Sequence, residues 1–181
     1  MFFPISLSIL LASPKFKHMS IHIDEFAVDD PGAVLAKLLD LIATTLQPIY
    51  GIGYSMPYYW GPNTFDQGLI ASRYATEDRT FYGAPPEIGR RSRAFSRTFL
   101  ANASERRLDV RMRDIFELNL LSEGHLAQPI NGTTLKDFIQ RQRIGRLNQL
   151  TPVTWQWNVP LADIEPVRRA LNDADFIIVK G

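Results

Sequence analysis

The order of strand and helix patterns at the N-terminal end of the chain constrains its fold most strongly. Apolar and polar residues alternate at about 3–11 and again at 18–24, which predicts two strands joined as a hairpin. An acidic cap at Asp30 and a proline at Pro31 predict the start of a helix. A third alternating run at 52–56 predicts a strand after that helix.

The C-terminal end shows the same order of elements. The runs 146–150 and 153–159 predict a second hairpin, and the latter alternates clearly between apolar and polar residues. A helix is predicted at about 161–172 and a last, fully apolar strand at 176–179, central in a sheet. The two ends therefore resemble each other in the order of elements, although not residue by residue.

These patterns predict an α+β fold: a mostly antiparallel sheet built from two strand–strand–helix–strand units, with helices packed on one face. A length of 181 residues fits a single domain. We expect residues 1–56 to form the first unit and 144–181 the second. An irregular helical and aromatic insertion with one strand is expected at 57–143.

Within the insertion, helices are predicted at about 64–74 and 86–103, and a strand at 108–113. Short helices are expected to begin after Ser122, whose hydroxyl can cap a helix, and near Thr134. The apolar face predicted for the first helix of the chain consists of Val34, Leu35, Leu38, Leu41, Ile42 and Leu46.

The chain has no cysteine, which excludes disulfides, thiolate nucleophiles and zinc sites that use sulfur. This composition agrees with a reducing compartment, and we expect the protein in the cytoplasm. The apolar residues 1–12 favour a strand because no basic residue precedes them, while a signal or anchor segment stays open as an alternative. No apolar run reaches the length of a membrane span.

No motif of catalysis, cofactor binding or metal binding is evident among the polar residues. His18 and His22 would lie about 13 Å apart on a strand, too far to hold one metal ion. His125 falls on the same helical turn as Ser122 and Glu123, which favours a helix cap over a catalytic triad. We therefore expect no catalytic residues, no metal and no cofactor.

The carboxylates leave one enzymatic alternative open. Glu77 and Asp78 lie in a predicted loop, where they are candidates for contact with a partner. A metal-dependent hydrolase would need such carboxylates to converge on a divalent ion with others from elsewhere in the chain. Asp29 and Asp30, in contrast, are explained by the start of a helix.

Residues 90–113 form the one region of distinct charge, with eight arginines against two acidic residues, a balance of +6. Arg90, Arg93 and Arg97 lie on one stripe of a predicted helix, and Arg111 and Arg113 are expected to extend it on a strand face. The stripe has three interpretations: a solvated or ion-paired face, a contact for an acidic protein, and a phosphate-binding surface. A net charge of only +1 and the lack of a basic tail count against nucleic acid.

A turn-rich segment carries three adjacent aromatic residues, Tyr58, Tyr59 and Trp60, directly after Pro57. Large aromatic side chains supply much contact area at a small entropic cost, and they are frequent at the energetic centres of protein interfaces. Three of them in a loop are difficult to bury together. They are the strongest candidates for contact with a partner.

Several stretches together resemble a known group of proteins. They are the helix end and Tyr-Gly run at 46–53, the segment 113–126, the apolar turn at 135–139, and the strand with Trp155 and Trp157. In pattern and order, this chain resembles the small α+β immunity proteins of bacterial polymorphic-toxin and type VI secretion systems. It is most similar to those paired with restriction-endonuclease-like toxins. The resemblance implies tight inhibition of a cognate toxin by covering its active site.

We therefore expect an immunity protein whose partner is a cognate toxin protein, for which nuclease activity stays open. The predicted partner-binding residues are Tyr58, Tyr59, Trp60, Glu77, Asp78, Arg90, Arg93 and Arg97. No contact with membranes is expected, and the oligomeric state is left open. The alternative function is a nucleic-acid-binding module that uses the arginine-rich helix at 90–113.

Overall fold

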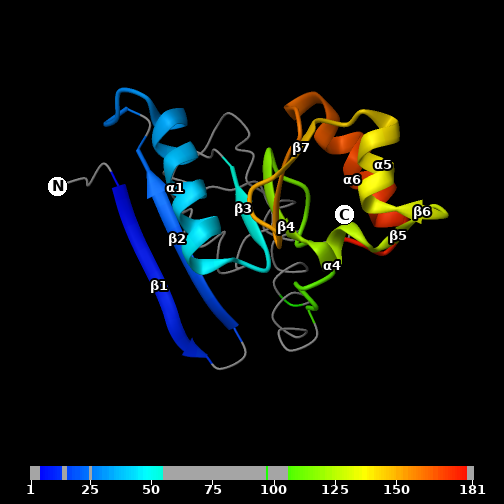
Figure 1. Cartoon of the computed structure of the whole chain (residues 1–181), viewed down its shortest axis with the longest axis horizontal. Helices are drawn as coiled ribbons and strands as arrows, with labels where there is room; N and C mark the ends of the chain where they lie inside the picture. Colours follow the sequence, from blue (N-terminus) through cyan, green and yellow to red (C-terminus); the bar gives the residue numbers. More distant parts are fainter. Residues whose placement is uncertain (1–4, 14–15, 25, 55–96, 98–105, 179–181) are drawn as a thin grey trace. The chain divides into compact units, whose positions relative to one another are not determined.

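A computed structural model describes residues 5–13, 16–24, 26–54, 97 and 106–178. The chain divides into two compact units, Met1–Gln47 and Pro48–Gly181, which we call unit 1 and unit 2 (Figure 1). Each unit is described by itself. The prediction of one domain stays a prediction. The helices predicted at 64–74 and 86–103 lie outside the described residues, except for Arg97.

Unit 1 contains a hairpin and a helix. Strands β1 (Ile5–Ser13) and β2 (Phe16–Ile23) pair antiparallel, with Ile5 opposite Ile23. Helix α1 (Pro31–Leu46) follows, and the Asp30 carboxylate caps it by accepting the N–H of Ala33 at 2.8 Å. The predicted hairpin and the predicted helix start are both confirmed.

The apolar face predicted for α1 is only partly correct. The side chains of Leu39 and Ala43 are buried, whereas Leu35, Leu41 and Leu46 are exposed. The physical reason is that the predicted face included Leu41 and left out Leu39, which is the buried leucine. Because successive residues of an α-helix turn by about 100°, Leu39 and Leu41 point in nearly opposite directions and cannot share one buried face.

In the described part of unit 2, the sheet has four strands. They are β3 (Gly51–Gly53), β4 (Leu118–Ser122), β8 (Thr154–Asn158) and β7 (Arg146–Gln149), in that spatial order. All neighbours in this sheet are antiparallel, so the α+β class is confirmed. The β1–β2 hairpin forms a separate two-stranded sheet. The first strand–strand–helix–strand run is therefore divided between two sheets, which corrects the prediction of a shared one.

Helices pack their apolar residues into one core with the sheet of unit 2. The helices are α4 (Glu123–Leu126), α5 (Leu135–Gln142) and α6 (Ile164–Asp173), and the short 3-10 helix η2 (Leu161–Asp163) precedes α6 without a buried residue. Trp157 is completely buried in that core. The predicted short helices after Ser122 and Thr134 and the predicted helix at 161–172 are confirmed, as is the β7–β8 hairpin. A small ladder, β5 (Pro129–Ile130) with β6 (Thr133–Thr134), precedes α5.

Two predicted strands of unit 2 are wrong. Residues 108–110 form a turn, because the N–H of Arg111 bonds back to the carbonyl of Arg107 at 2.7 Å. Met112 then makes a single parallel bridge with Ile177. Backbone hydrogen bonds join the segments 108–113 and 176–178 only around this bridge, so neither is a central strand. Apolar alternation at 108–113 arises from burial beside a turn.

Among the described residues, no helix is both long and apolar enough to cross a membrane.

Candidate functional site

Most of the residues predicted to contact a partner lie outside the described part of the chain. These residues are Tyr58, Tyr59, Trp60, Glu77, Asp78, Arg90 and Arg93. Arg97 is described, and it is helical and exposed, as expected for a residue of a polar helix face. The predicted roles of all eight residues stay predictions.

The C-terminal end of the arginine-rich block does not continue the predicted exposed stripe. Arg106 and Arg113 are buried, and burial together with the nearby charge of Arg113 lowers the pKa of Arg106. Arg111 is half-buried and bonds to the Asp175 carboxylate and the carbonyl of Ile177. The reason is that the turn and bridge at 108–112 draw these side chains toward the interior. The expectation that Arg111 and Arg113 extend an exposed arginine stripe is therefore wrong.

His125 lies at the centre of a buried polar cluster in unit 2. Its Nδ1 accepts the backbone N–H of Ser122 at 3.1 Å, so Nδ1 carries no proton. Its Nε2 lies 3.3 Å from the carbonyl oxygen of Arg111 and therefore carries the proton of the neutral ring. Burial lowers the pKa of His125 from 6.5 to about 4, although the bond to Arg111 and the charge of Asp109 oppose this shift.

The Ser122 hydroxyl lies 2.8 Å from Nδ1 of His125 and donates to the carbonyl of Asp109 at 3.1 Å. In a catalytic pair, the histidine would face a reactive hydroxyl from another element and would be open to substrate. Here the ring is completely buried, and the two residues form a capping box at the start of α4. The predicted cap is confirmed, and this cluster holds the turn at 108–110 and the following Arg111 against α4.

Tyr50 packs on the other side of the same histidine. The two rings stack with centroids 5.5 Å apart, and Phe176 meets the His125 ring edge-on at 6.4 Å. The Tyr50 hydroxyl accepts the N–H of Arg113 at 3.0 Å, and burial raises the pKa of this phenol. Although they are distant in sequence, Tyr50, the segment 111–113, His125 and Phe176 therefore meet around the histidine ring.

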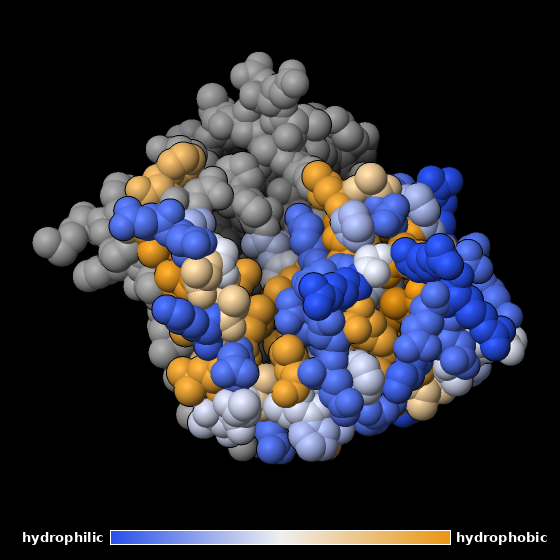
Figure 2. Space-filling view, turned by 45° about the horizontal axis from the view of Figure 1, so that its top comes forward, coloured by the Kyte–Doolittle hydropathy of each residue, from blue (hydrophilic) through white to orange (hydrophobic). Residues whose placement is uncertain are grey.

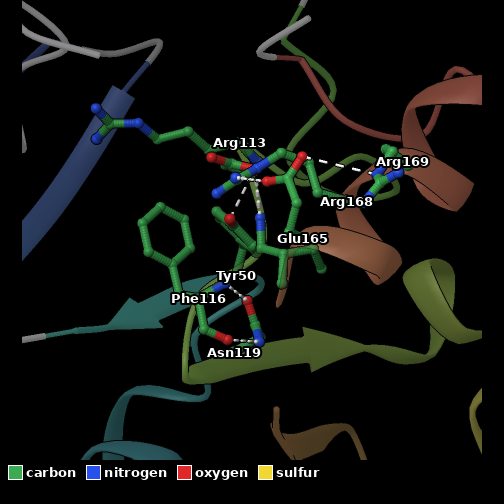
Figure 3. Close-up of polar contacts among 9 residues, drawn as sticks. Tyr50, Arg113, Phe116, Asn119, Glu165, Arg168 and Arg169 are labelled. Carbon is green, nitrogen blue, oxygen red and sulfur yellow. Dashed lines mark hydrogen bonds and ion pairs between the residues drawn. The ribbon is translucent and has the colours of Figure 1, made fainter. Parts of the chain in front are cut away.

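A second polar cluster ties the loop before β4 to α6 (Figure 3). Arg168 donates from Nε to Asp114 and from Nη1 to Glu165, both at 2.7 Å. Burial opposes the charge of Arg168, but the bond to Asp114 and both carboxylate charges outweigh it and raise the pKa of the guanidinium. The completely buried Asn119 side chain bonds to both backbone polar groups of Phe116. These contacts make a rigid scaffold.

The surface of unit 2 is hollowed between α5 and α6. The hollow has a volume of about 370 Å³ and is lined by Phe138, Gln142, Arg143, Ile144, Asp163, Pro166, Val167 and Ala170. Its floor is apolar and its rim is polar. In Figure 2, hydrophilic residues gather at the right-hand side, where α5 and α6 lie, with hydrophobic side chains between them. An apolar centre with a polar rim is the usual anatomy of a protein interface.

A second hollow of about 540 Å³ adjoins the first and shares Arg143 and Asp163 with it. It is lined also by Gly145, Arg146 and residues 158–160. It lies where β7 begins and β8 ends. The two hollows together extend from the groove between the helices to the border of the sheet.

Two exposed arginines, Arg143 and Arg146, line these hollows, and a third exposed arginine, Arg141, lies two residues before Arg143 in the chain. No ion pair joins them to a carboxylate in the described part of the chain. This cluster of three arginines was not predicted from the sequence, because seven basic residues are balanced by eight acidic residues over the whole of 114–181. A shorter window reveals it, since residues 138–162 hold these three arginines and no acidic residue.

The geometry offers binding surfaces. Within the described ranges, no three histidine, aspartate or glutamate side chains come together as metal ligands do. The chain matches no protein-family model, no curated protein and no solved structure. The resemblance to immunity proteins therefore stays a prediction that rests on residue pattern and order.

Proposed function

We propose that this chain is an immunity protein of the cytoplasm that binds a cognate bacterial toxin effector and neutralises it by covering the active site of the toxin. The resemblance of 46–53, 113–126 and 135–139 to small α+β immunity proteins supports the proposal. A binding role also fits the three adjacent aromatic residues at 58–60.

The observation that carries the proposal is the apolar hollow with its arginine rim on unit 2. Arginine is enriched at the energetic centres of interfaces, where an apolar floor excludes water around it. The rim is held in place from below, because the indole N–H of the buried Trp157 donates to the carbonyl of Ile144 at 2.9 Å. An inhibitor benefits from such a preformed surface, since little conformational entropy is lost on binding.

The proposal is tested by expressing the chain with the product of a neighbouring toxin-like gene in the source genome. We expect growth to be restored, and the two proteins to copurify in equal amounts. Ala170→Arg fills the hollow with a charged side chain and should weaken binding by about tenfold or more. Ala127→Arg, the same change at an exposed position after α4, is the matched control and should bind normally. A chain that neither binds nor protects refutes the proposed function.

The alternative, a nucleic-acid-binding module at 90–113, has less support than its sequence suggested. Two of its eight arginines, Arg106 and Arg113, are buried and so do not reach a phosphate backbone. Such a module would retard DNA or RNA in gels, with an affinity that falls steeply with salt. Absence of retardation at about 50 mM salt would exclude it.

A further inference from the structure

Strand β7 is an outer strand of the four-stranded sheet, and its free edge can be assigned residue by residue. The N–H of Leu150, just beyond the end of β7, donates to the carbonyl of Thr154, the first residue of β8, at 2.9 Å. Bonded and non-bonded pairs alternate along an antiparallel ladder, so the even-numbered residues of β7 bond to β8. The backbone groups of Leu147 and Gln149 then point away from β8.

The other side of β8 supports this assignment. The N–H of Val159 donates to the carbonyl of Glu117 at 2.9 Å, which makes the odd-numbered residues of β8 the ones that bond to β4. The even-numbered residues of β8 are therefore the ones that bond to β7. No described strand pairs with the outer edge of β7. Two N–H donors and two carbonyl acceptors on this edge have no strand partner among the described residues and can bond to a further strand.

The charge around this edge selects the chemistry of its occupant. Arg146 begins β7 and Arg143 precedes it by three residues, and both line the second hollow. Guanidinium groups without a carboxylate partner favour acidic side chains, with which they can form paired hydrogen bonds. A second copy of β7 would bring the same arginines toward each other, and like charges that face each other across an interface are repelled.

The hollows favour a peptide over nucleic acid. Asp163 lines both of them, and its carboxylate repels a phosphate chain, which carries a charge at every unit, whereas a peptide can place an apolar side chain beside it. The floor of the first hollow is formed by apolar side chains such as Phe138 and Val167, which suit a hydrophobic side chain. An extended segment along β7 that continues past Arg143 would bring such a side chain to the groove between α5 and α6.

We propose that an extended acidic segment of the partner protein adds as a strand to the outer edge of β7. Its carboxylates pair with Arg143 and Arg146, and one of its apolar side chains enters the hollow between α5 and α6. This inference rests on the proposed function only in the premise that the chain acts by binding a protein. Strand addition supplies affinity through backbone hydrogen bonds, and the flanking pockets supply specificity.

The test titrates the full ¹⁵N-labelled chain with a capped peptide in which glutamate and valine alternate. We expect saturable shifts of the backbone amide signals of Leu147 and Gln149. The double variant Arg143→Glu with Arg146→Glu should weaken the binding of the peptide by about tenfold or more, because the attraction between the arginines and the glutamates becomes repulsion. Arg107→Glu reverses the charge of an exposed arginine in the 107–110 turn and should leave the peptide affinity unchanged.

Backbone pairing is tested by a proline scan of two neighbouring residues. Gln149→Pro removes an outward N–H, so the protein should fold normally and lose affinity for the peptide. Asn148→Pro removes a bond to β8 and should instead destabilise the fold. Circular dichroism and thermal unfolding establish that each variant is folded before it is titrated.

The outcomes separate the inference from the proposed function. The inference is wrong if the peptide causes no saturable shift, if a lysine–valine peptide binds equally well, or if duplex DNA shifts the same amides at lower concentration. If the toxin binds the chain and the double arginine variant binds it equally well, strand addition at β7 is refuted and the immunity function stands. If the acidic peptide binds as expected and the toxin does not, the surface stands and the immunity function is refuted.

Discussion

Acidification from about pH 7.5 to about pH 5 should protonate His125 far more readily in the unfolded chain than in the folded one. The ring is completely buried, and its neutral form satisfies one donor and one acceptor of the backbone. A proton on Nδ1 would face the N–H of Ser122, so the charged ring loses that bond as well as its hydration.

The magnitude follows from the pKa of the two states. The pKa of His125 is about 4 in the folded protein and 6.5 in its ordinary, exposed state. Between these values the unfolded chain binds more protons, so the free energy of unfolding decreases as the pH falls. The contribution is fully present above pH 6.5 and is lost as the pH approaches 4. The loss attributable to this ring between about pH 7.5 and about pH 5 is about 2 kcal/mol.

The assay is urea unfolding at both pH values, followed by tryptophan fluorescence, for the natural chain and for His125→Gln. Glutamine does not titrate, so the difference between the two proteins in their pH dependence isolates the histidine from all carboxylates. On acidification, we expect the free energy of unfolding of the natural chain to decrease by about 2 kcal/mol more than that of the variant. If the variant does not fold, the NMR signals of the His125 ring give its pKa directly. Equal losses in both proteins, or a ring that titrates near its ordinary pKa, would refute the reasoning.

Three further substitutions follow from local geometry, each measured by urea or thermal unfolding. Gly145→Ala should destabilise unit 2 by about 2 kcal/mol or more, because Gly145 has a φ of +67° and a Cβ there would collide with the carbonyl of Asn158; unchanged stability would contradict the geometry. Asn119→Ala should lower the free energy of unfolding by about 3 kcal/mol, because it leaves buried backbone groups of Phe116 without partners. A decrease below about 1 kcal/mol would mean that water replaces the amide. Asp30→Ala should cost about 1 kcal/mol through the loss of the α1 cap, and Asp30→Ser should restore most of it.

Elements that depend on local signals were predictable from the sequence. Asp30 and Pro31 mark the start of α1, and strict alternation around Trp155 and Trp157 marks β8. Strand β4 was not predicted as a strand, because its residues are buried on both faces and so do not alternate. Which strands share a sheet depends on contacts distant in sequence, which local patterns do not encode.

The candidate site was less predictable than the fold. The exposed state of Arg97 agrees with the sequence, but burial of Arg113 depends on Tyr50 and on the bridge at Met112, which are tertiary contacts. The three arginines at 141–146 could have been found by a narrower charge window. The hollows beside them could not have been predicted from the sequence, because they arise only where α5, α6 and the end of β8 come together.

The link between α5 and β7 has a consequence for the speed of binding. Arg143 and Gly145 both have left-handed backbone angles, and the carbonyl of Ile144 between them is held by the Trp157 indole. A loop fixed in this way has no slow rearrangement to make when a partner arrives. Association should then follow a single phase whose rate rises linearly with partner concentration and falls with added salt, while the dissociation rate changes little.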